Sequence, residues 1–312
     1  MRRLWNIAIS IVTLLSVASV GAQNSQRDNR VRLADPFILL DNGTYYAYGT
    51  HHRHGIEYYI SNDLKKWHYG GVALHKRDSY GEKWFWAPEV HLVNGVYYMF
   101  YTAQERTCVA TSSSPTGPFV QREQKPLIEG YKNIDNTLFI DDDGTPYMFF
   151  VRVGRPFKIC VAELERDLQS IKEKSIHTCI SPTQSWERKQ GLVNEGPSVI
   201  KHEGIYYMLY SGNGYTSQSY GIGYATARSI KGPWRKSSLN PILQYPGDLV
   251  GAGHGAPFYD KKGHLHYVFH AHYNHEKIHP RCMYIARASI KRGKRDNKLN
   301  ISNKYWTPTV VK

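Results

Sequence analysis

The 312-residue sequence predicts an all-β fold, a five-bladed β-propeller with four-stranded antiparallel blades. Three observations lead to this prediction. A pattern of apolar strand, glycine turn and aromatic-rich strand occurs five times, its turn glycines are 49 to 60 residues apart, and no segment has the periodicity of an amphipathic helix. Five similar units of this length are typical of propeller blades around a central channel.

The five hairpins can be quoted directly from the sequence. They are DPFILLDNGTYYAYGT at 35–50, APEVHLVNGVYYMFYT at 87–102, IDNTLFIDDDGTPYMFFV at 134–151, EGPSVIKHEGIYYMLYS at 195–211 and GHGAPFYDKKGHLHYVFH at 253–270. The second half of the unit also recurs, as SNDLKKW at 61–67, TSSSPTGPF at 111–119 and TARSIKGPW at 226–234. Each unit therefore holds about four strands, whereas a solenoid would need shorter repeats and a sandwich would not repeat one motif five times.

The first 22 residues have the composition of a secretory signal peptide: two arginines, an apolar run, and small residues before an expected cleavage after Ala22. A membrane anchor is the alternative, but the run is at the short limit for a span. We expect a signal peptide at 1–22 and one propeller domain at 23–312 with a basic C-terminal segment. The protein would be exported, periplasmic or secreted, with no membrane insertion after cleavage; its oligomeric state stays open.

The formal net charge is +14, and part of it lies in the C-terminal segment KRGKRDNKLNISNKYW. Nucleic acid is the first partner that such a charge suggests, but zinc-finger spacing and the common RNA-binding motifs are absent. We therefore expect no nucleic acid, and an acidic polysaccharide would use the charge more naturally.

Four cysteines in an exported chain suggest disulfides. Cys160 and Cys179 flank an expected hairpin and are the plausible pair. Cys108 and Cys282 lie in different blades and are expected to be buried free thiols.

Several polar residues lie at nearly the same position of the repeat, close to the start of its first strand. Acids are poor strand residues, and three of them lie eight or nine residues before the turn glycine. The residues brought to this position by the five repeats are Asp35, Trp86 with Glu89, Asp135, Glu195 and His254. A single acid here would be read as a turn residue, but three around one opening indicate a shared function.

Three carboxyls around one pocket suit the hydrolysis of a glycosidic bond. Inversion needs a protonated acid for the leaving oxygen and a carboxylate to activate water, roughly 6.5–9.5 Å apart. Acids on different blades of a propeller suit that separation. A third carboxylate would raise the pKa of the acid.

The segments ADP at 34–36, WAPE at 86–89, IDNTLFIDDDG at 134–144, NEGP at 194–197 and GAGHG at 251–255 resemble glycoside hydrolase family 43. The resemblance extends over residues 31–290. It implies that Asp35 is the general base, Asp135 the aspartate that modulates the pKa of the acid, and Glu195 the general acid. One departure is Asn136, because the family usually has proline after the modulating aspartate.

The resemblance also implies further site residues. His254 matches a histidine that in many relatives helps to hold calcium or sodium on the channel axis, often through water; hydrogen bonding to a carboxylate is its alternative role. Arg281 resembles an arginine that touches substrate. Independently of the resemblance, Phe85 and Trp86 in KWFWAPE are the best candidates for a wall that stacks on a sugar ring, with core packing as the alternative, and Glu89 and His254 are also expected to bind substrate. No cofactor is required, and zinc at the other histidines is disfavoured because no ligand set is visible.

The resulting expectation is an inverting, exo-acting glycosidase that removes α-L-arabinofuranosyl or β-xylosyl residues from plant cell-wall polysaccharides such as arabinan or arabinoxylan. The short sequence beyond the propeller favours an arabinofuranosidase over a β-xylosidase. Endo-arabinanase or xylanase action, and a non-catalytic carbohydrate-binding propeller, are the alternatives. A fructan-cleaving enzyme is disfavoured because the sequence reads LADPF at Asp35.

Overall fold

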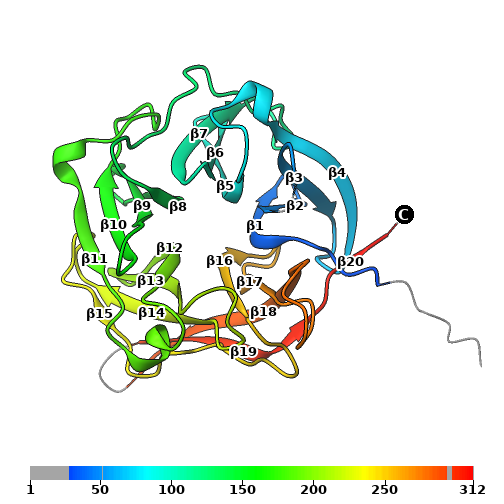
Figure 1. Ribbon diagram of the computed structural model, residues 1–312, viewed down its shortest axis with the longest axis vertical. Coiled ribbons are helices and arrows are strands. Elements are labelled where there is room, and N and C mark those ends of the chain that lie inside the picture. The colour runs from blue at the N-terminus through cyan, green and yellow to red at the C-terminus, as the bar shows by residue number, and fades with distance from the viewer. Residues whose placement is uncertain (1–27, 51, 294–296, 312) are drawn as a thin grey trace, which may run out of the picture.

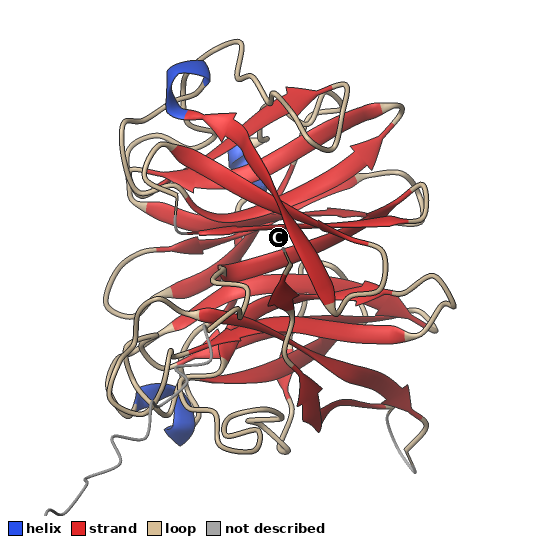
Figure 2. Ribbon diagram, turned by 90° about the vertical axis from the view of Figure 1, so that its right-hand side faces the viewer, coloured by secondary structure: helices blue, strands red, loops and turns tan. Residues whose placement is uncertain are grey.

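The computed structural model describes residues 28–50, 52–293 and 297–311, and the expected signal peptide at 1–22 lies outside this part of the chain. Five sheets stand around a central axis (Figure 1). Almost all regular structure is strand (Figure 2), which confirms the predicted all-β propeller. None of the described helices is long and apolar enough to cross a membrane.

The blades follow one another along the chain, and in each the first strand lies nearest the axis. Blade 1 consists of β1 (Ala34–Asp41), β2 (Thr44–Thr50), β3 (Gly55–Ser61) and β4 (Lys66–His75), and blade 2 of β5 (Trp86–Val93), β6 (Val96–Ala103) and β7 (Arg106–Ser112). Blade 3 consists of β8 (Asn133–Ile140), β9 (Pro146–Arg152), β10 (Lys158–Glu163) and β11 (His177–Ile180).

Blade 4 consists of β12 (Asn194–His202), β13 (Ile205–Gly212), β14 (Gly221–Ala227) and β15 (Arg235–Lys236), and blade 5 of β16 (Gly253–Tyr259), β17 (Leu265–Ala271), β18 (Cys282–Lys291) and β19 (Lys298–Trp306). Three short 3-10 helices lie between strands in the part of the chain that the structure describes, at Lys76–Asp78, Glu173–Ser175 and Ser185–Arg188. The first two strands of every blade form the hairpins that the repeated motif predicts.

Blades 1 and 2 depart from the four-stranded antiparallel pattern. In blade 2 the fourth strand is reduced to a bridge between Thr111 and Val120. Blade 1 gains a fifth strand, β20 (Thr309–Val310), which pairs in parallel with β4. The Val31 N–H also donates to the Pro308 carbonyl at 3.0 Å. The two ends of the described chain are thus fastened to the same blade, which closes the ring.

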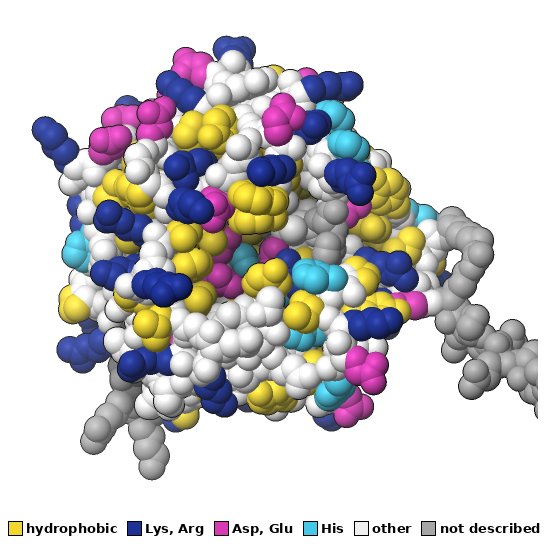
Figure 3. All heavy atoms as spheres, in the orientation of Figure 1, with side chains coloured by type: hydrophobic (Ala, Val, Ile, Leu, Met, Phe, Trp, Pro, Cys, Tyr) yellow, Lys and Arg dark blue, Asp and Glu magenta, His cyan; other side chains and the backbone are white. Residues whose placement is uncertain are grey.

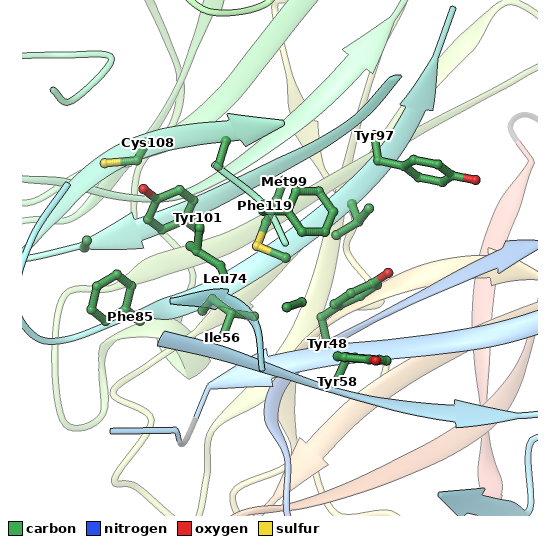
Figure 4. Close-up of a cluster of buried hydrophobic side chains, with 14 residues drawn as sticks. Tyr48, Ile56, Tyr58, Leu74, Phe85, Tyr97, Met99, Tyr101, Cys108 and Phe119 are labelled. Carbon is green, nitrogen blue, oxygen red and sulfur yellow. The ribbon is translucent and has the colours of Figure 1, made fainter. Parts of the chain in front are cut away.

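The core is divided into five clusters, one between each pair of neighbouring blades. This follows from the two-residue period of a strand, because successive side chains point to opposite faces. Phe149 packs between blades 3 and 4, for example, and Phe150 packs between blades 2 and 3. Figure 4 shows the cluster between blades 1 and 2, where Tyr48 and Tyr58 face Tyr97 and Met99. Aromatic side chains fill the wedge between the sheets.

The first strand of every blade carries a β-bulge near its start, seen as a register shift against the second strand. One residue at each bulge has a positive φ, namely Asp35 (49°), Ala87 (44°), Asp135 (56°), Gly196 (55°) and His254 (37°). Such backbone is costly for residues other than glycine and is common at functional sites, where a bulge redirects a side chain. All five bulges lie at the same end of the propeller.

All four cysteines are free thiols. The expectation for Cys108 and Cys282 is therefore confirmed, and the expected bridge between Cys160 and Cys179 is wrong. Cys160 packs in the cluster between blades 2 and 3, whereas Cys179 packs against the cluster between blades 3 and 4. The two side chains point to opposite faces of one sheet, so nearness in sequence does not bring their sulfurs together.

Thiol titration of the unfolded, unreduced protein should therefore find four groups per chain. A reduced sample is the control and should give the same number. A value near two before reduction would show that blade 3 carries a disulfide and that the strand register near Cys179 is different.

Candidate active site

The starts of the first strands surround a hollow at the centre of one face. Figure 3 shows acidic and histidine side chains gathered in this hollow. The three predicted acids all lie there and are almost completely buried, with exposed fractions of 8% for Asp35, 7% for Asp135 and 9% for Glu195. The structure therefore brings together the residues that the repeat alignment selected.

The alignment of the three acids is nevertheless off by one residue in blade 4. Asp35 and Asp135 lie at the bulge positions of blades 1 and 3, whereas the bulge residue of blade 4 is Gly196. Glu195 is the residue before it, paired with Ser211 of β13. A shift of one residue in a strand turns the side chain toward a different direction. The acids are thus not three copies of one position, and Glu195 approaches the hollow differently from the two aspartates.

The bulges are tied together by hydrogen bonds from blade to blade. The N–H of Ala87 donates to Thr50 Oγ1 at 3.0 Å, and the N–H of Asp135 donates to Thr102 Oγ1 at 2.9 Å. The same bond runs from His254 N to Ser211 Oγ at 2.8 Å and from Asp35 N to His270 Nδ1 at 3.1 Å. In each case the acceptor belongs to the end of the second strand of the preceding blade. A buried N–H is thereby satisfied at four of the five bulges.

The fifth bulge differs because the equivalent position of blade 3 is Val151, which has no polar side chain. Here the Gly196 N–H donates instead to Asp135 Oδ2 at 3.1 Å. Gly196 also cannot carry a side chain, since a Cβ would lie 2.8 Å from the His254 ring. Asp135 therefore holds the backbone next to Glu195, and the NEGP motif follows from close packing at this point.

Asp35 forms an ion pair with Arg281. Arg281 donates from Nη1 to Oδ1 at 2.8 Å and from Nη2 to Oδ2 at 3.3 Å, and Thr50 donates to Oδ2 at 2.7 Å. Burial alone would raise the pKa of Asp35, but the charge of Arg281, followed by the two histidines His254 and His270, holds it well below its usual range. Asp35 is therefore a carboxylate at any ordinary pH.

The pKa values of Glu195 and Asp135 are shifted upward, opposite to that of Asp35. Burial, with the negative charge of Asp35, raises the pKa of Glu195 to about 7, although the hydroxyl of Tyr220 donates to Oε1 at 2.6 Å and opposes the shift. Burial and then the charges of Glu195 and Asp35 hold the pKa of Asp135 well above its usual range. The two carboxyls titrate as a coupled pair that retains a proton near neutral pH.

Of the expected aromatic wall, Trp86 is the first residue of β5, is half-buried and packs against the cluster between blades 3 and 4, and Phe85 lies in the core. Phe85 is 3% exposed and stacks on Tyr101 in the core at 6.2 Å between ring centroids. Trp84 is 46% exposed and stacks on Trp86 at 5.8 Å. Alternation along WFW places the two tryptophans on one side and the phenylalanine on the other.

Tyr220 is a site residue that the sequence reasoning missed. It directly precedes β14, as Arg281 directly precedes β18, so both reach the hollow from the start of a third strand. The aligned repeats place Tyr220 and Arg281 at the same position, directly before the third strand of a blade, and this shared position is the signal that could have identified Tyr220.

Glu89 and His254 line a small cavity together with Asp35 and Asp135, and every blade contributes its bulge residue to the lining. Glu89 Oε2 accepts from Thr137 Oγ1 and lies 3.2 Å from His91 Nε2. His254 Nδ1 lies 3.4 Å from Asp35 Oδ1, and burial lowers the pKa of His254. Within the described residues no three His, Cys, Asp or Glu side chains are grouped to hold a metal. Calcium or sodium at His254 stays a prediction, and no chemical step is assigned to it.

Comparison with known proteins agrees with this site. The sequence profile of glycosyl hydrolases family 43 matches residues 29–292. The crystal structure of an endo-1,4-beta-xylanase from Bacteroides thetaiotaomicron superposes with a TM-score of 0.87 at 46% identity, covering 91% of this chain and 99% of that one.

Two curated relatives are more distant. Beta-D-galactofuranosidase xynD of Aspergillus niger is 32% identical over 187 residues, 57% of this chain and 51% of the relative. Extracellular endo-alpha-(1->5)-L-arabinanase 1 of Bacillus subtilis is 22% identical over 244 residues, 71% of this chain and 73% of the relative. The chain thus spans about half the length of the Aspergillus relative. Because the family profile runs through all five blades and includes each of the three acids, the chain belongs to glycosyl hydrolases family 43.

Proposed function

We propose that the protein hydrolyses a glycosidic bond to a pentose in plant cell-wall polysaccharide, with inversion at the anomeric carbon. One observation carries the proposal: two buried carboxyls of the same hollow have pKa values shifted in opposite directions, Asp35 down and Glu195 up to about 7. An acid and a base that must act at one pH need this separation. A non-catalytic carbohydrate-binding propeller would have no use for it.

In this mechanism Glu195 is the general acid and Asp35 the general base. Glu195 gives its proton to the oxygen that leaves the sugar, while Asp35 removes a proton from a water on the opposite face of the ring. Asp135 contributes twice. Its bond to the Gly196 N–H holds the backbone that carries Glu195, and its own carboxyl shares the proton of the coupled pair.

Arg281 has a role in the free protein that its resemblance to a substrate-binding arginine does not describe. It occupies both oxygens of Asp35, and a carboxylate stabilised so strongly is a weak proton acceptor. We infer that a sugar hydroxyl takes over part of the Arg281 hydrogen bonding when substrate enters. Asp35 would then become a stronger base only in the presence of substrate.

The substrate class is inferred from the relatives and from the rim of the hollow. The relatives are named for xylan, arabinan and galactofuranoside cleavage. Trp84, with Lys83 Nζ 4.2 Å from the centroid of its ring, stacks on Trp86, and we infer that the part of this pair that stays exposed packs against the carbon face of a sugar. We infer exo-action that releases single arabinofuranosyl or xylosyl units from the end of a chain.

Endo-action is the second candidate, favoured by the 46% identity to a structure named endo-1,4-beta-xylanase. The first products from linear xylan or arabinan separate the two modes. Exo-action releases single pentoses at once, whereas endo-action first yields oligosaccharides. We also infer export, because one relative is named extracellular and residues 1–22 have the composition of a signal peptide.

Glu195→Gln and Asp35→Asn should each lower kcat on nitrophenyl α-L-arabinofuranoside or β-xyloside by at least about a hundredfold, since positioned acid–base groups contribute on this scale. Asp142→Asn is the matched control, because its side chain is 83% exposed in the turn after β8. The control should keep wild-type turnover. Near-normal turnover of either site variant would remove that residue from the mechanism.

Activity should fall as pH rises through about 7, because the raised pKa of Glu195 is the point at which the acid loses its proton. Tyr220→Phe should move this fall to higher pH. The Tyr220 hydroxyl donates to the Glu195 carboxylate and stabilises its charged form, so removing it raises the pKa of Glu195. The measurement is kcat/KM between pH 4 and 10. A fall that moves to lower pH in this variant would contradict the assignment of Glu195 as the acid.

A further inference from the structure

A buried ion pair lies in blade 4, outside the ring of carboxyls. Lys236 belongs to β15, the outermost strand of this blade (Figure 1), and its Nζ lies 2.5 Å from Oε1 and 2.7 Å from Oε2 of Glu187. The Glu187 side chain has no exposed surface, and that of Lys236 is 9% exposed. Removing two charges from water is expensive unless further hydrogen bonds complete the pair. Neither residue has a part in the mechanism above.

The Glu187 carboxylate ties the linker between blades 3 and 4 to the sheet of blade 4. Its Oε2 accepts the N–H groups of Thr183 at 2.7 Å and Gln184 at 2.8 Å, at the start of the 3-10 helix Ser185–Arg188. Its Oε1 accepts the hydroxyl of Tyr210, in β13, at 2.7 Å. A carboxylate that accepts several hydrogen bonds can stay charged when buried. Glu187 therefore fixes where the ammonium of its partner can lie.

The tryptophan of the 3-10 helix packs against the same sheet. Trp186 is 6% exposed, and its ring lies where a Cβ on Gly212 would come within 2.5 Å and a Cβ on Gly223 within 2.7 Å. Because both positions are glycine, the ring can contact the backbone of β13 and β14. Gly212 is also the ladder partner of Asn194 in β12. The helix is thus seated over the part of the sheet where β12 begins.

Lys236 extends this network to the residue before the general acid. Its Nζ has three acceptors, which match the three hydrogens of an ammonium: the Glu187 carboxylate, the Ser181 carbonyl oxygen at 2.6 Å and Asn194 Oδ1 at 2.9 Å. Asn194 is completely buried and directly precedes Glu195. The ion pair therefore holds the side chain next to the acid from the outer part of blade 4.

Glu195 consequently lies between two anchored neighbours. On one side Lys236 holds Asn194, and on the other Asp135 accepts the N–H of Gly196 at 3.1 Å. One anchor comes from the outer strand of blade 4 and the other from the bulge of blade 3. A general acid must stay within hydrogen-bond reach of the leaving oxygen, and a displacement of about 1 Å can cost about a hundredfold in rate.

We propose that the buried pair Lys236 and Glu187 positions the general acid Glu195 through Asn194. Both are positioning residues, because they act on the acid only through its neighbour. The role of Glu195 rests on the proposed function, whereas the anchoring of the backbone around it does not. Loss of the anchor should lower kcat and leave KM for a small pentoside nearly unchanged, since the anchor binds the protein chain and not the sugar.

Two variants of the full chain test the proposal. Lys236→Met/Glu187→Gln removes both charges together, so that no uncompensated charge stays buried. Asn194→Ala removes only the acceptor and leaves the ion pair in place, so it carries the test if the double variant does not fold. The matched control is Lys201→Met/Asp141→Asn, which removes the 2.6 Å ion pair near the other end of β12. Each protein is assayed well below its melting temperature.

The first readout needs no activity. Hydrogen exchange, followed by mass spectrometry, should become faster at residues 193–197 in both test variants and stay at the wild-type rate in the control. The second readout is turnover of nitrophenyl and dinitrophenyl pentosides. In the test variants kcat should fall about tenfold on the nitrophenyl substrate and less than about threefold on the dinitrophenyl substrate, because dinitrophenolate leaves without needing a proton from the acid.

Wild-type exchange at residues 193–197 in both test variants would overturn the proposal. An equal fall of kcat on the two substrates would also overturn it, because the loss would then not arise at the acid. So would the same changes in the control, since any lost ion pair of this strand would then have the effect. Wild-type protein that turns over no pentoside would instead refute the proposed function, and the exchange rates would still decide whether the anchor exists.

Discussion

A β-bulge at the start of every innermost strand turns one backbone N–H toward the neighbouring blade, and the site depends on the bonds made there. Four of these N–H groups are accepted by a side chain at the end of a second strand, such as Thr50 or Ser211. The bonds fix how the blades meet at the hollow. They also hold the backbone in positive-φ conformations that bring Asp35 and Asp135 to its edge.

The bulge at Gly196 lacks this bond to a preceding blade's second strand, and the contact that replaces it positions the carboxyls of the site. The side chain of Val151 cannot accept a hydrogen bond, so an oxygen of the Asp135 carboxyl accepts the N–H of Gly196. That contact draws Asp135 toward the segment that carries Glu195. In a buried hollow, Arg281 pairs with Asp35, and His254, whose Nδ1 lies 4.0 Å from Asp135 Oδ2, has its own pKa lowered by burial and so offers little positive charge to the other two carboxyls. Keeping a proton on that pair costs less than burying two more negative charges.

The fold could be predicted from the sequence because a propeller repeats itself. The turn glycines and aromatic strands recur wherever a blade needs a tight hairpin and a packed face, and that regularity also marked Asp35 and Asp135. The one-residue offset of Glu195 could not be seen, since a bulge changes the register without changing the spacing by more than one residue. The opposite faces of Cys160 and Cys179 were hidden for the same reason. Spacing does not show on which side of a sheet a side chain lies.

The stereochemistry of the product tests the central claim, that Asp35 acts on water while Glu195 protonates the leaving oxygen. Proton NMR during the first minutes of hydrolysis identifies the anomer before mutarotation mixes the two forms. The account predicts that the released sugar first appears with inverted configuration. A retained configuration would mean that one carboxylate bonds to the anomeric carbon and that the two carboxyls lie only about 5 Å apart. That result would contradict the roles assigned to both residues.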